Sequence, residues 1–323
     1  MLPHRGTVRW PCRPELLSLA VRLIPSAFAL SIACSAMPHP TPWIGFEDLV
    51  DVLHDRSIVV LSGAGVSTES GIPDYRGPDT RHKERNPIRY RAFVRDAASR
   101  QHYWGRSAIG WPSFRTAQPN DGHRALAAME AAGLVKGIIT QNVDRLHQKA
   151  GSERVIELHG ALAEVECLDC GTLSSRDRLQ QRLLEANPAW GGSEAEQAPD
   201  GDAELSVAAT QAFRVPGCTA CHGTLKPHVV FFGENVPRPR VDAAFRMLDA
   251  ADALLVVGSS LTVYSGFRFV RRAAANGQPV GIVNLGETRG DALATVCVEG
   301  KTGTVLPALT AALRGGVTSM SCG

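Results

Sequence analysis

Four of the eight cysteines stand in two C-x-x-C pairs, Cys167 with Cys170 and Cys218 with Cys221. Thiolates at this spacing can surround Zn²⁺ as a tetrahedron, with Zn–S distances of about 2.3 Å. Because four thiolates close the coordination shell, we expect one structural zinc ion per chain and no metal-bound catalytic water. Redox pairs or thiols without a metal are the less favoured interpretation.

A glycine-rich loop follows the apolar run from 58 to 61. A strand that leads through Gly63, Ala64 and Gly65 into a helix start lets backbone N–H groups approach a pyrophosphate. We therefore expect a dinucleotide-binding loop that opens a helix. The signal is weak by itself, because the third glycine comes late, at Gly71, and the usual acidic partner is unclear.

A third group of polar residues follows two further apolar runs. Gln141, Asn142 and Asp144 come directly after the run from 135 to 140, at the carboxyl end where open α/β sheets bind ligands. His159 follows the next strand-like run. A histidine at such an edge suits a general base near neutral pH, and a structural histidine explains its position equally well.

Alternating helix and strand patterns must position these residues. We expect helices at 46–54, 122–132, 264–276 and 305–313, and strands at 58–61, 135–140, 253–258 and 279–284. Such alternation predicts an α/β fold with a Rossmann-type doubly wound parallel sheet, joined by a small zinc-binding module and a helical cover.

The same patterns predict the domain organisation. Residues 1–36 form an N-terminal extension, which we expect to be poorly ordered. A first part of the Rossmann-type domain covers 37–166, with the helical cover at 77–118. The zinc-binding module covers 167–222, and the second part of the Rossmann-type domain covers 223–323.

The composition, with 44% hydrophobic and 20% charged residues, is that of an ordinary globular protein, and the formal charge of +2 gives little attraction for nucleic acid. We expect small molecules and protein segments as partners, and neither nucleic acid nor membrane.

Residues 1–36 are basic, with three interpretations: an export signal, a transit peptide, or an extension before a start at Met37. The third is favoured and predicts a bacterial cytoplasmic protein; a transit peptide predicts the mitochondrial matrix.

Taken together, these motifs resemble those of the sirtuins, the NAD-dependent protein deacylases. The matching segments occur in family order: GAGVSTESGIPDYR (63–76), TQNVD (140–144), LHG (158–160), both C-x-x-C pairs, LKPHVVFFGE (225–234), VGSSL (257–261) and IVN (282–284). NPAW (187–190), VVGSSLTVYSG (256–266) and Tyr75 resemble the class II, sirtuin-4-like branch.

The resemblance implies that NAD is a consumed co-substrate. The acyl oxygen of a modified lysine attacks the nicotinamide ribose, nicotinamide leaves, and His159 deprotonates the ribose hydroxyl that attacks the resulting imidate. The products are free lysine, nicotinamide and O-acyl-ADP-ribose. Partners are then acylated lysine-containing proteins. Two rivals stay open: mono-ADP-ribosyl transfer to protein at the same NAD site, and a non-enzymatic NAD-sensing module.

The resemblance also implies residue roles. His159, Asn142 and Asp144 are the expected catalytic residues. The expected NAD-binding residues are Gly63, Ala64, Gly65, Ser67, Thr68, Asp74, Tyr75, Arg76, Gln141, Asn142, Val143, Asp144, Gly258, Ser259, Ser260, Asn284, Leu285, Gly286 and Thr302. The expected substrate-binding residues are Val230, Phe231, Phe232, Gly233, Glu234, Tyr103 and Arg106.

Two of these substrate assignments have alternatives. By composition, the run from 229 to 234 is a core strand, and only the resemblance makes it a strand that pairs with the substrate backbone. Tyr103 and Arg106 share a helix face, and a Tyr/Arg pair of this spacing marks sirtuins that remove negatively charged acyl groups. Arg106 is hypothesised to bind an acyl carboxylate, although a surface arginine is the somewhat favoured alternative.

Overall fold

The computed structural model describes residues 43–75, 87–190, 202, 203 and 205–315, which belong to one compact unit. The predicted N-terminal extension, the predicted start at Met37 and Arg76, which is predicted to bind NAD, lie outside the described residues. Of the helices within the described ranges, none is long and apolar enough to cross a membrane.

Six parallel strands form the larger sheet, in the order β3-β2-β1-β7-β8-β9. The chain runs outward from β1 to β3, then returns to β7 and runs outward to β9, so the predicted doubly wound parallel sheet is confirmed. The switch in direction lies between β1 and β7. The strands are β1 (Ile58–Ser62), β2 (Val135–Thr140), β3 (Val155–Glu157), β7 (Ala253–Val257), β8 (Val280–Asn284) and β9 (Val296–Glu299).

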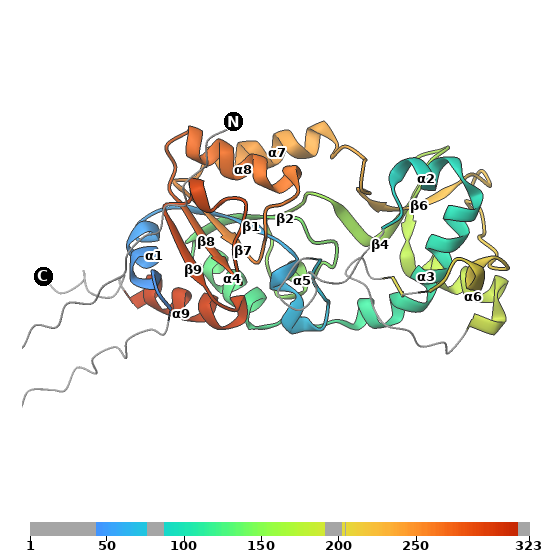
Figure 1. Ribbon diagram of the computed structural model, residues 1–323, viewed down its shortest axis with the longest axis horizontal. Coiled ribbons are helices and arrows are strands. Elements are labelled where there is room, and N and C mark those ends of the chain that lie inside the picture. Colours follow the sequence, from blue (N-terminus) through green and yellow to red (C-terminus); the bar gives the residue numbers. More distant parts are fainter. Residues whose placement is uncertain (1–42, 76–86, 191–201, 204, 316–323) are drawn as a thin grey trace, which may run out of the picture. The chain divides into compact units, whose positions relative to one another are not determined.

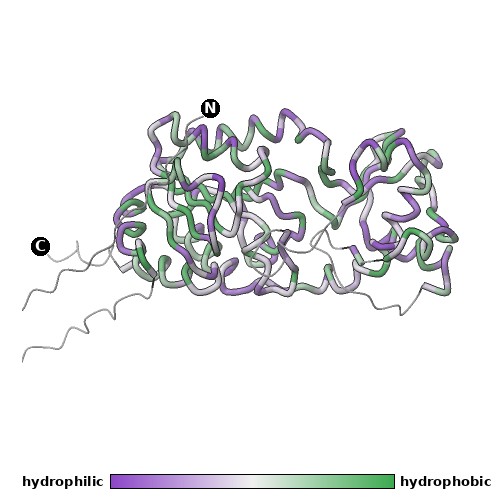
Figure 2. The backbone as a smooth tube through the Cα atoms, in the orientation of Figure 1, coloured by the Kyte–Doolittle hydropathy of each residue, from purple (hydrophilic) through white to green (hydrophobic). Residues whose placement is uncertain are grey.

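Helices cover both faces of this sheet (Figure 1). Because strand side chains alternate, Ile58 and Val60 of β1 enter one apolar core and Val59 and Leu61 enter the other. Figure 2 shows these strands as the hydrophobic centre of the large lobe. One core lies under α1 (Phe46–Leu53), α4 (Asp121–Ala131) and α9 (Thr302–Gly315), the other under α7 (Arg238–Asp249) and α8 (Tyr264–Ala275).

A smaller antiparallel sheet, in the order β5-β4-β6, forms the second lobe with the cysteine segments. Its core includes Trp104 and Phe93, both fully buried, and the Trp104 indole donates a hydrogen bond to the Leu225 carbonyl at 3.2 Å. The helical cover therefore packs on this sheet. The elements are α2 (Tyr90–Arg95), α3 (Ala97–Thr116), β4 (Gly160–Cys167), β5 (Leu173–Ser175), α6 (Arg176–Ala186) and β6 (Leu225–Val229).

The expected helices and strands of the large lobe occur within three residues of their predicted ends, but two other expectations are wrong. The glycine loop opens two 3₁₀ turns (Ala64–Val66 and Thr68–Ser70) in place of a longer helix, because the chain turns at Gly71 (φ +84°) and Pro73 follows. The strand expected at 229–234 ends at Val229, and the chain turns at Gly233 (φ +82°).

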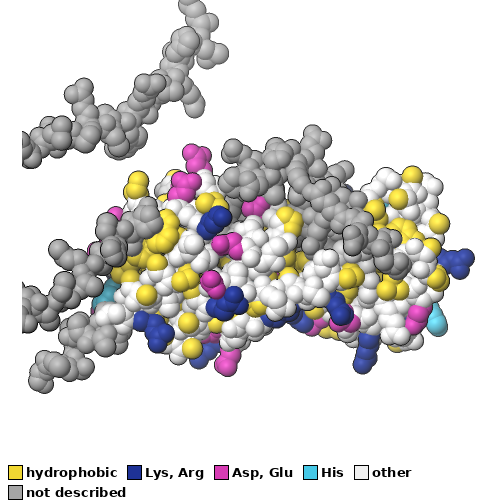
Figure 3. Space-filling view, turned by 90° about the horizontal axis from the view of Figure 1, so that it is seen from below, with side chains coloured by type: hydrophobic (Ala, Val, Ile, Leu, Met, Phe, Trp, Pro, Cys, Tyr) yellow, Lys and Arg dark blue, Asp and Glu magenta, His cyan; other side chains and the backbone are white. Residues whose placement is uncertain are grey.

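The remaining short elements are α5 (Leu146–Lys149) and three 3₁₀ turns at Pro188–Trp190, Ala208–Thr210 and Asp291–Leu293. On the face shown in Figure 3, basic and acidic side chains of the described residues are interspersed.

Two buried histidines predict acid sensitivity. His123 of α4 and His147 of α5 are at most 1% exposed, with ring centroids 4.9 Å apart, and burial lowers the pKa of His123 to about 4 and that of His147 to about 3. Below pH 6.5 the unfolded chain binds protons that the folded chain does not, so stability falls as the pH falls. We expect a loss of about 2 kcal/mol per ring between pH 7.5 and pH 5.

Urea unfolding at the two pH values measures this loss. A His147→Asn variant, which has one buried ring fewer, should show a weaker pH dependence over the same window. An unfolding free energy that is equal at both pH values would contradict the prediction.

Candidate active site

A cavity of about 890 Å³ lies at the carboxyl ends of β1, β2 and β7, beside the switch point of the sheet. Parallel strands end at one edge, so loops distant in sequence meet here. Among the predicted residues, those lining it are Gly63, Ala64, Gly65, Ser67, Thr68, Asp74, Tyr75, Tyr103, Gln141, Asn142, Val143, Asp144, His159, Val230, Phe231, Phe232, Gly233, Glu234, Gly258, Ser259, Ser260, Asn284, Leu285 and Thr302. Arg106 and Gly286 do not line it.

The glycines after β1 and β7 let two loops touch backbone to backbone. Gly65 N donates a hydrogen bond to the Gly258 carbonyl at 2.8 Å. A Cβ on Gly63 would lie 2.7 Å from that same carbonyl oxygen, and a Cβ on Gly258 (φ +58°) would lie 2.4 Å from Val66 N. Close packing between the loops therefore requires glycine at these positions.

Replacing Gly258 by alanine should displace the first loop. We expect a loss of stability of roughly 1–3 kcal/mol beyond the backbone strain, and a raised KM for NAD. Gly277→Ala is the matched control, because Gly277 has a similar φ of +72° but nothing within 4 Å of an added Cβ. Thermal unfolding and NAD titration measure both effects, and equal behaviour of the two variants would contradict this explanation.

Asn142 and Asp144 tie the first loop to the end of β2. Asn142 Nδ2 donates to the Gly63 carbonyl at 3.0 Å and to Ser67 Oγ at 3.1 Å, and Asn142 is only 9% exposed. Ser67 Oγ donates in turn to Asp144 Oδ2 at 2.7 Å. Burial raises the pKa of Asp144, while hydrogen bonds from Leu146 N and Ser67 oppose that rise. Both side chains are thus fixed in the cavity wall.

His159 is held as a neutral imidazole with a defined tautomer. Its Nδ1 lies 2.8 Å from the Gln141 carbonyl, which can only accept, so Nδ1 carries the proton and Nε2 carries the lone pair. Burial lowers the pKa of His159 to about 4, with Arg240 and Arg268 lowering it further and the Gln141 bond opposing them. At neutral pH the ring is therefore in the form that a general base requires.

Ser265 is a site residue that the sequence analysis missed. Its Oγ lies 2.8 Å from His159 Nε2, it is 8% exposed, and it lines the cavity from the first turn of α8. The available signal was the Ser-Gly pair within VVGSSLTVYSG, at the start of a predicted helix. Only the fold brings this turn to the histidine.

The segment after β6 is shaped by a buried ion pair. Lys226, which is 3% exposed, donates to the Val229 carbonyl at 2.6 Å and lies 3.1 Å from Glu234 Oε2. The same Oε2 accepts from Phe231 N at 2.9 Å. The Glu234 carboxylate, predicted to bind substrate, therefore binds its own chain and fixes the turn that lines the cavity.

One end of the cavity is apolar. Ile72, Phe114, Leu162 and Val229 line it and belong to one buried cluster at the join of the two lobes. Tyr103, 4% exposed, lies beside this end and packs edge-on against Phe231, with ring centroids 5.3 Å apart. This end suits an apolar chain.

Arg106 points away from that cavity. Its Nε donates to the Ala203 carbonyl at 2.8 Å, and its Nη1 lies 4.0 Å from the carboxylate of Asp202, which is 1% exposed. Tyr103 and Arg106 both lie on α3, yet the structure brings only Tyr103 to the cavity. The reason is that residues 202 and 203 pack against the helix and bind the guanidinium of Arg106.

Other residues that line the cavity are polar. Gln141 Nε2 donates to Ser259 Oγ at 2.8 Å, and Ser260 Oγ lies 3.1 Å from Thr262 Oγ1. Asn284 donates to the Leu285 and Gly286 carbonyls at 3.0 Å each, so it shapes its own loop. Thr302 also lines the cavity, and its Oγ1 is buried without a hydrogen-bond partner among the described residues.

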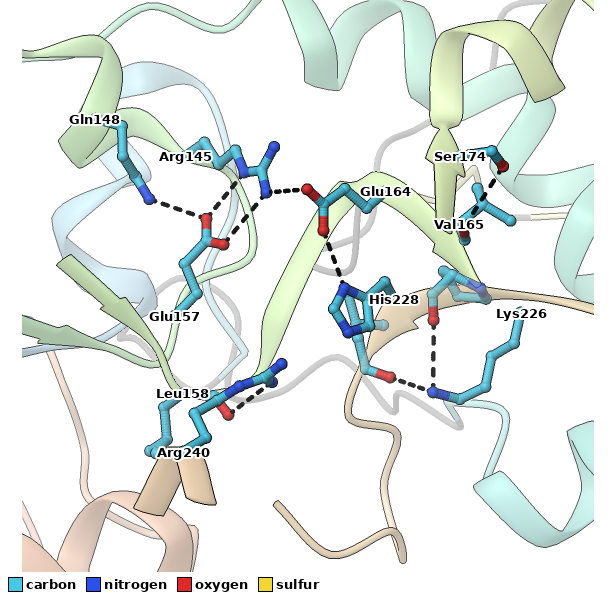
Figure 4. A network of polar contacts seen from close by, with 12 residues as sticks. Arg145, Gln148, Glu157, Leu158, Glu164, Val165, Ser174, Lys226, His228 and Arg240 are labelled. Atoms are coloured by element: carbon cyan, nitrogen blue, oxygen red, sulfur yellow. Dashed lines mark hydrogen bonds and ion pairs between the residues drawn. The ribbon is translucent and has the colours of Figure 1, made fainter. Parts of the chain in front are cut away.

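A charged network joins β3 of the large sheet to β4 and β6 of the small sheet (Figure 4). Arg145 binds Glu157 of β3 at 3.0 Å and Glu164 of β4 at 2.7 Å. Glu164 also binds His228 of β6 at 3.0 Å. Because His159 lies in the chain between the two glutamates, this network fixes the path of the segment that carries the histidine.

The four predicted zinc ligands form one cluster. Their sulfur atoms all lie within 4.8 Å of one another, with Cys167 and Cys221 3.5 Å apart and Cys170 and Cys218 3.8 Å apart. A tetrahedral Zn²⁺ with Zn–S bonds of about 2.3 Å places its sulfurs about 3.8 Å apart, so the donor set fits zinc. All ligands are protein thiolates, and the cluster is separate from the cavity residues, which suits a structural ion.

Comparison with known proteins agrees with this architecture. The Sir2 family model matches residues 63–265. An NAD-dependent protein deacetylase of Xanthomonas axonopodis pv. citri is 56% identical over 246 residues, covering 76% of this chain and 84% of that protein. The NAD-dependent protein deacylase Sirt4 of Drosophila melanogaster is 45% identical over 281 residues, covering 84% and 89%.

Solved structures show the same fold. A Sir2 complex with p53 peptide and NAD⁺ superposes with a TM-score of 0.68 and 31% identity, covering 85% of this chain and all of that chain. The doubly wound sheet, the cavity at its switch point and the four-cysteine lobe therefore define a Rossmann-type protein with a zinc-binding module. The chain belongs to the Sir2 family.

Proposed function

We propose that this chain is an NAD-dependent protein-lysine deacylase that consumes NAD and yields nicotinamide and O-acyl-ADP-ribose. The observation that carries the proposal is the neutral His159, which lines one cavity with the glycine loop, Asn142 and Asp144 and whose Nε2 is unprotonated. A base, a glycine-rich loop and an apolar cluster meet in one cavity. The names of the relatives, deacetylase and deacylase, support the same activity.

We propose roles for the residues as follows. The glycine loop from 63 to 68 contacts the diphosphate, with Ser259 and Ser260 on the ribose side. Asn142 and Asp144 form the nicotinamide end. The apolar end, with Tyr103 and Phe231, takes the acyl-lysine side chain, and the turn from 230 to 234 contacts the substrate backbone.

Acidic acyl groups are not supported as the preferred substrates, because the guanidinium of Arg106 is occupied by Ala203 and Asp202. The cysteine cluster holds zinc, which stabilises the small lobe when bound. Cysteines that serve as metal ligands favour a reducing compartment, and we propose the bacterial cytoplasm, with the mitochondrial matrix as the alternative.

A mass-resolved screen tests the activity. Acetyl-, glutaryl- and lipoyl-lysine peptides are incubated with the protein, with and without NAD. Free lysine peptide together with O-acyl-ADP-ribose, formed only with NAD, is the expected result. ADP-ribose bound to protein without deacylation would support mono-ADP-ribosyl transfer, and NAD binding without any turnover would support the sensing module.

A further inference from the structure

Ser265 occupies the reactive nitrogen of the proposed base. Because the Gln141 carbonyl takes Nδ1–H, the Ser265 hydroxyl, 2.8 Å from Nε2, must donate to that nitrogen. A neutral imidazole offers one lone pair at Nε2. A substrate hydroxyl therefore cannot bond to Nε2 while Ser265 does, but it can donate to the free lone pairs of the Ser265 oxygen.

The backbone fixes Ser265 in this position. The next residue, Gly266, lets α8 lie close to Gln141, because a Cβ at this position would lie 2.4 Å from Gln141 Oε1. Gln141 is the residue whose carbonyl orients His159, and its side-chain amide is held by Ser259. The first turn of α8, Gln141 and His159 thus form one packed unit, and both Ser265 and His159 line the cavity.

We propose that Ser265 is a catalytic proton relay between the ribose hydroxyl and His159, an inference that rests on the proposed deacylase function. As the ribose oxygen bonds to the acyl carbon, its O–H bond breaks and the proton passes to Ser265 Oγ. The proton of Ser265 passes at the same time to Nε2. The serine ends as a neutral hydroxyl and His159 as an imidazolium, so atoms and charge balance without a further reactant.

The relay predicts different effects on the two chemical steps. Nicotinamide release and its reversal need no base. The exchange of labelled nicotinamide into NAD measures this step. Ser265→Ala should leave this exchange at the wild-type rate and lower O-acyl-ADP-ribose formation at least tenfold, within the range of general-base effects. Ser265→Thr keeps a hydroxyl at the same backbone position and should retain product formation.

A structural role for Ser265 would lower exchange and product formation together, and this result would overturn the relay. Unchanged or faster product formation in Ser265→Ala would overturn it too, because the hydroxyl would then only occupy the Nε2 lone pair without passing on a proton. If the wild-type protein with an acyl peptide exchanges no nicotinamide and forms no product, the deacylase proposal fails, whatever the serine does.

A readout without turnover tests the same hydrogen bond. In the ligand-free protein, the ¹⁵N resonance of His159 Nε2 should be that of a lone pair that accepts a hydrogen bond. It should move to the free-lone-pair position in Ser265→Ala and stay in place in Ser265→Thr. An Nε2 resonance that is the same in wild type and Ser265→Ala would overturn the inference.

Discussion

Replacing His159 by alanine is expected to lower O-acyl-ADP-ribose formation by about 10²–10⁴-fold, the usual contribution of a positioned general base. The neutral ring, with Nδ1 bound to Gln141 and a pKa of about 4, supplies the lone pair that accepts a proton when the ribose hydroxyl is deprotonated. Nicotinamide exchange should persist in the variant, because nicotinamide leaves before the base acts. Single-turnover mass spectrometry and a labelled-nicotinamide exchange assay separate the two steps.

His54→Ala is the matched control, since the His54 side chain is 41% exposed after α1 and does not line the cavity. It should behave as wild type in both assays. Product formation at the wild-type rate in His159→Ala would contradict the base assignment. A loss of exchange as large as the loss of product would instead place His159 in NAD binding.

Removing the zinc ligands is expected to unfold the small lobe. Cys167 is fully buried in the core that also contains Trp104, Phe93 and Tyr103, so loss of the metal opens that core and the acyl end of the cavity with it. Structural zinc contributes on the order of 10 kcal/mol to such sites. Cys167→Ser, or chelation of the wild-type protein, should therefore abolish deacylation and lower the melting temperature.

Metal analysis and hydrogen exchange measure this effect. Wild type should carry one zinc per chain, and the variant should lose amide protection in β4, β6 and α3 while the large sheet keeps its own. Cys297→Ser, at an exposed cysteine outside the cluster, is the control and should keep its zinc. A metal-free protein with an intact small lobe would show that the thiols alone hold the fold.

The parallel sheet could be predicted because its strands are buried on both faces. Such strands appear in the sequence as continuous apolar runs, as in Ile58 to Leu61. The alternation of helices and strands along the chain then indicates the doubly wound arrangement. The glycine loop and the 229–234 segment could not be predicted in detail. The chain turns at Gly71 and Gly233 with positive φ, a backbone conformation that any glycine permits but none requires.

The sequence by itself determined the elements of the large sheet, the family resemblance and the chemical identity of the zinc ligands, because these depend on residue type and spacing. Only the tertiary structure decided which side chains meet. In the folded chain Arg106 lies beside Asp202, and the Glu234 carboxylate accepts a hydrogen bond from Phe231 N. Ser265 lies within hydrogen-bond distance of His159. The physical reason is that a hydrogen bond depends on distances between atoms of segments far apart in the chain, and packing alone sets those distances.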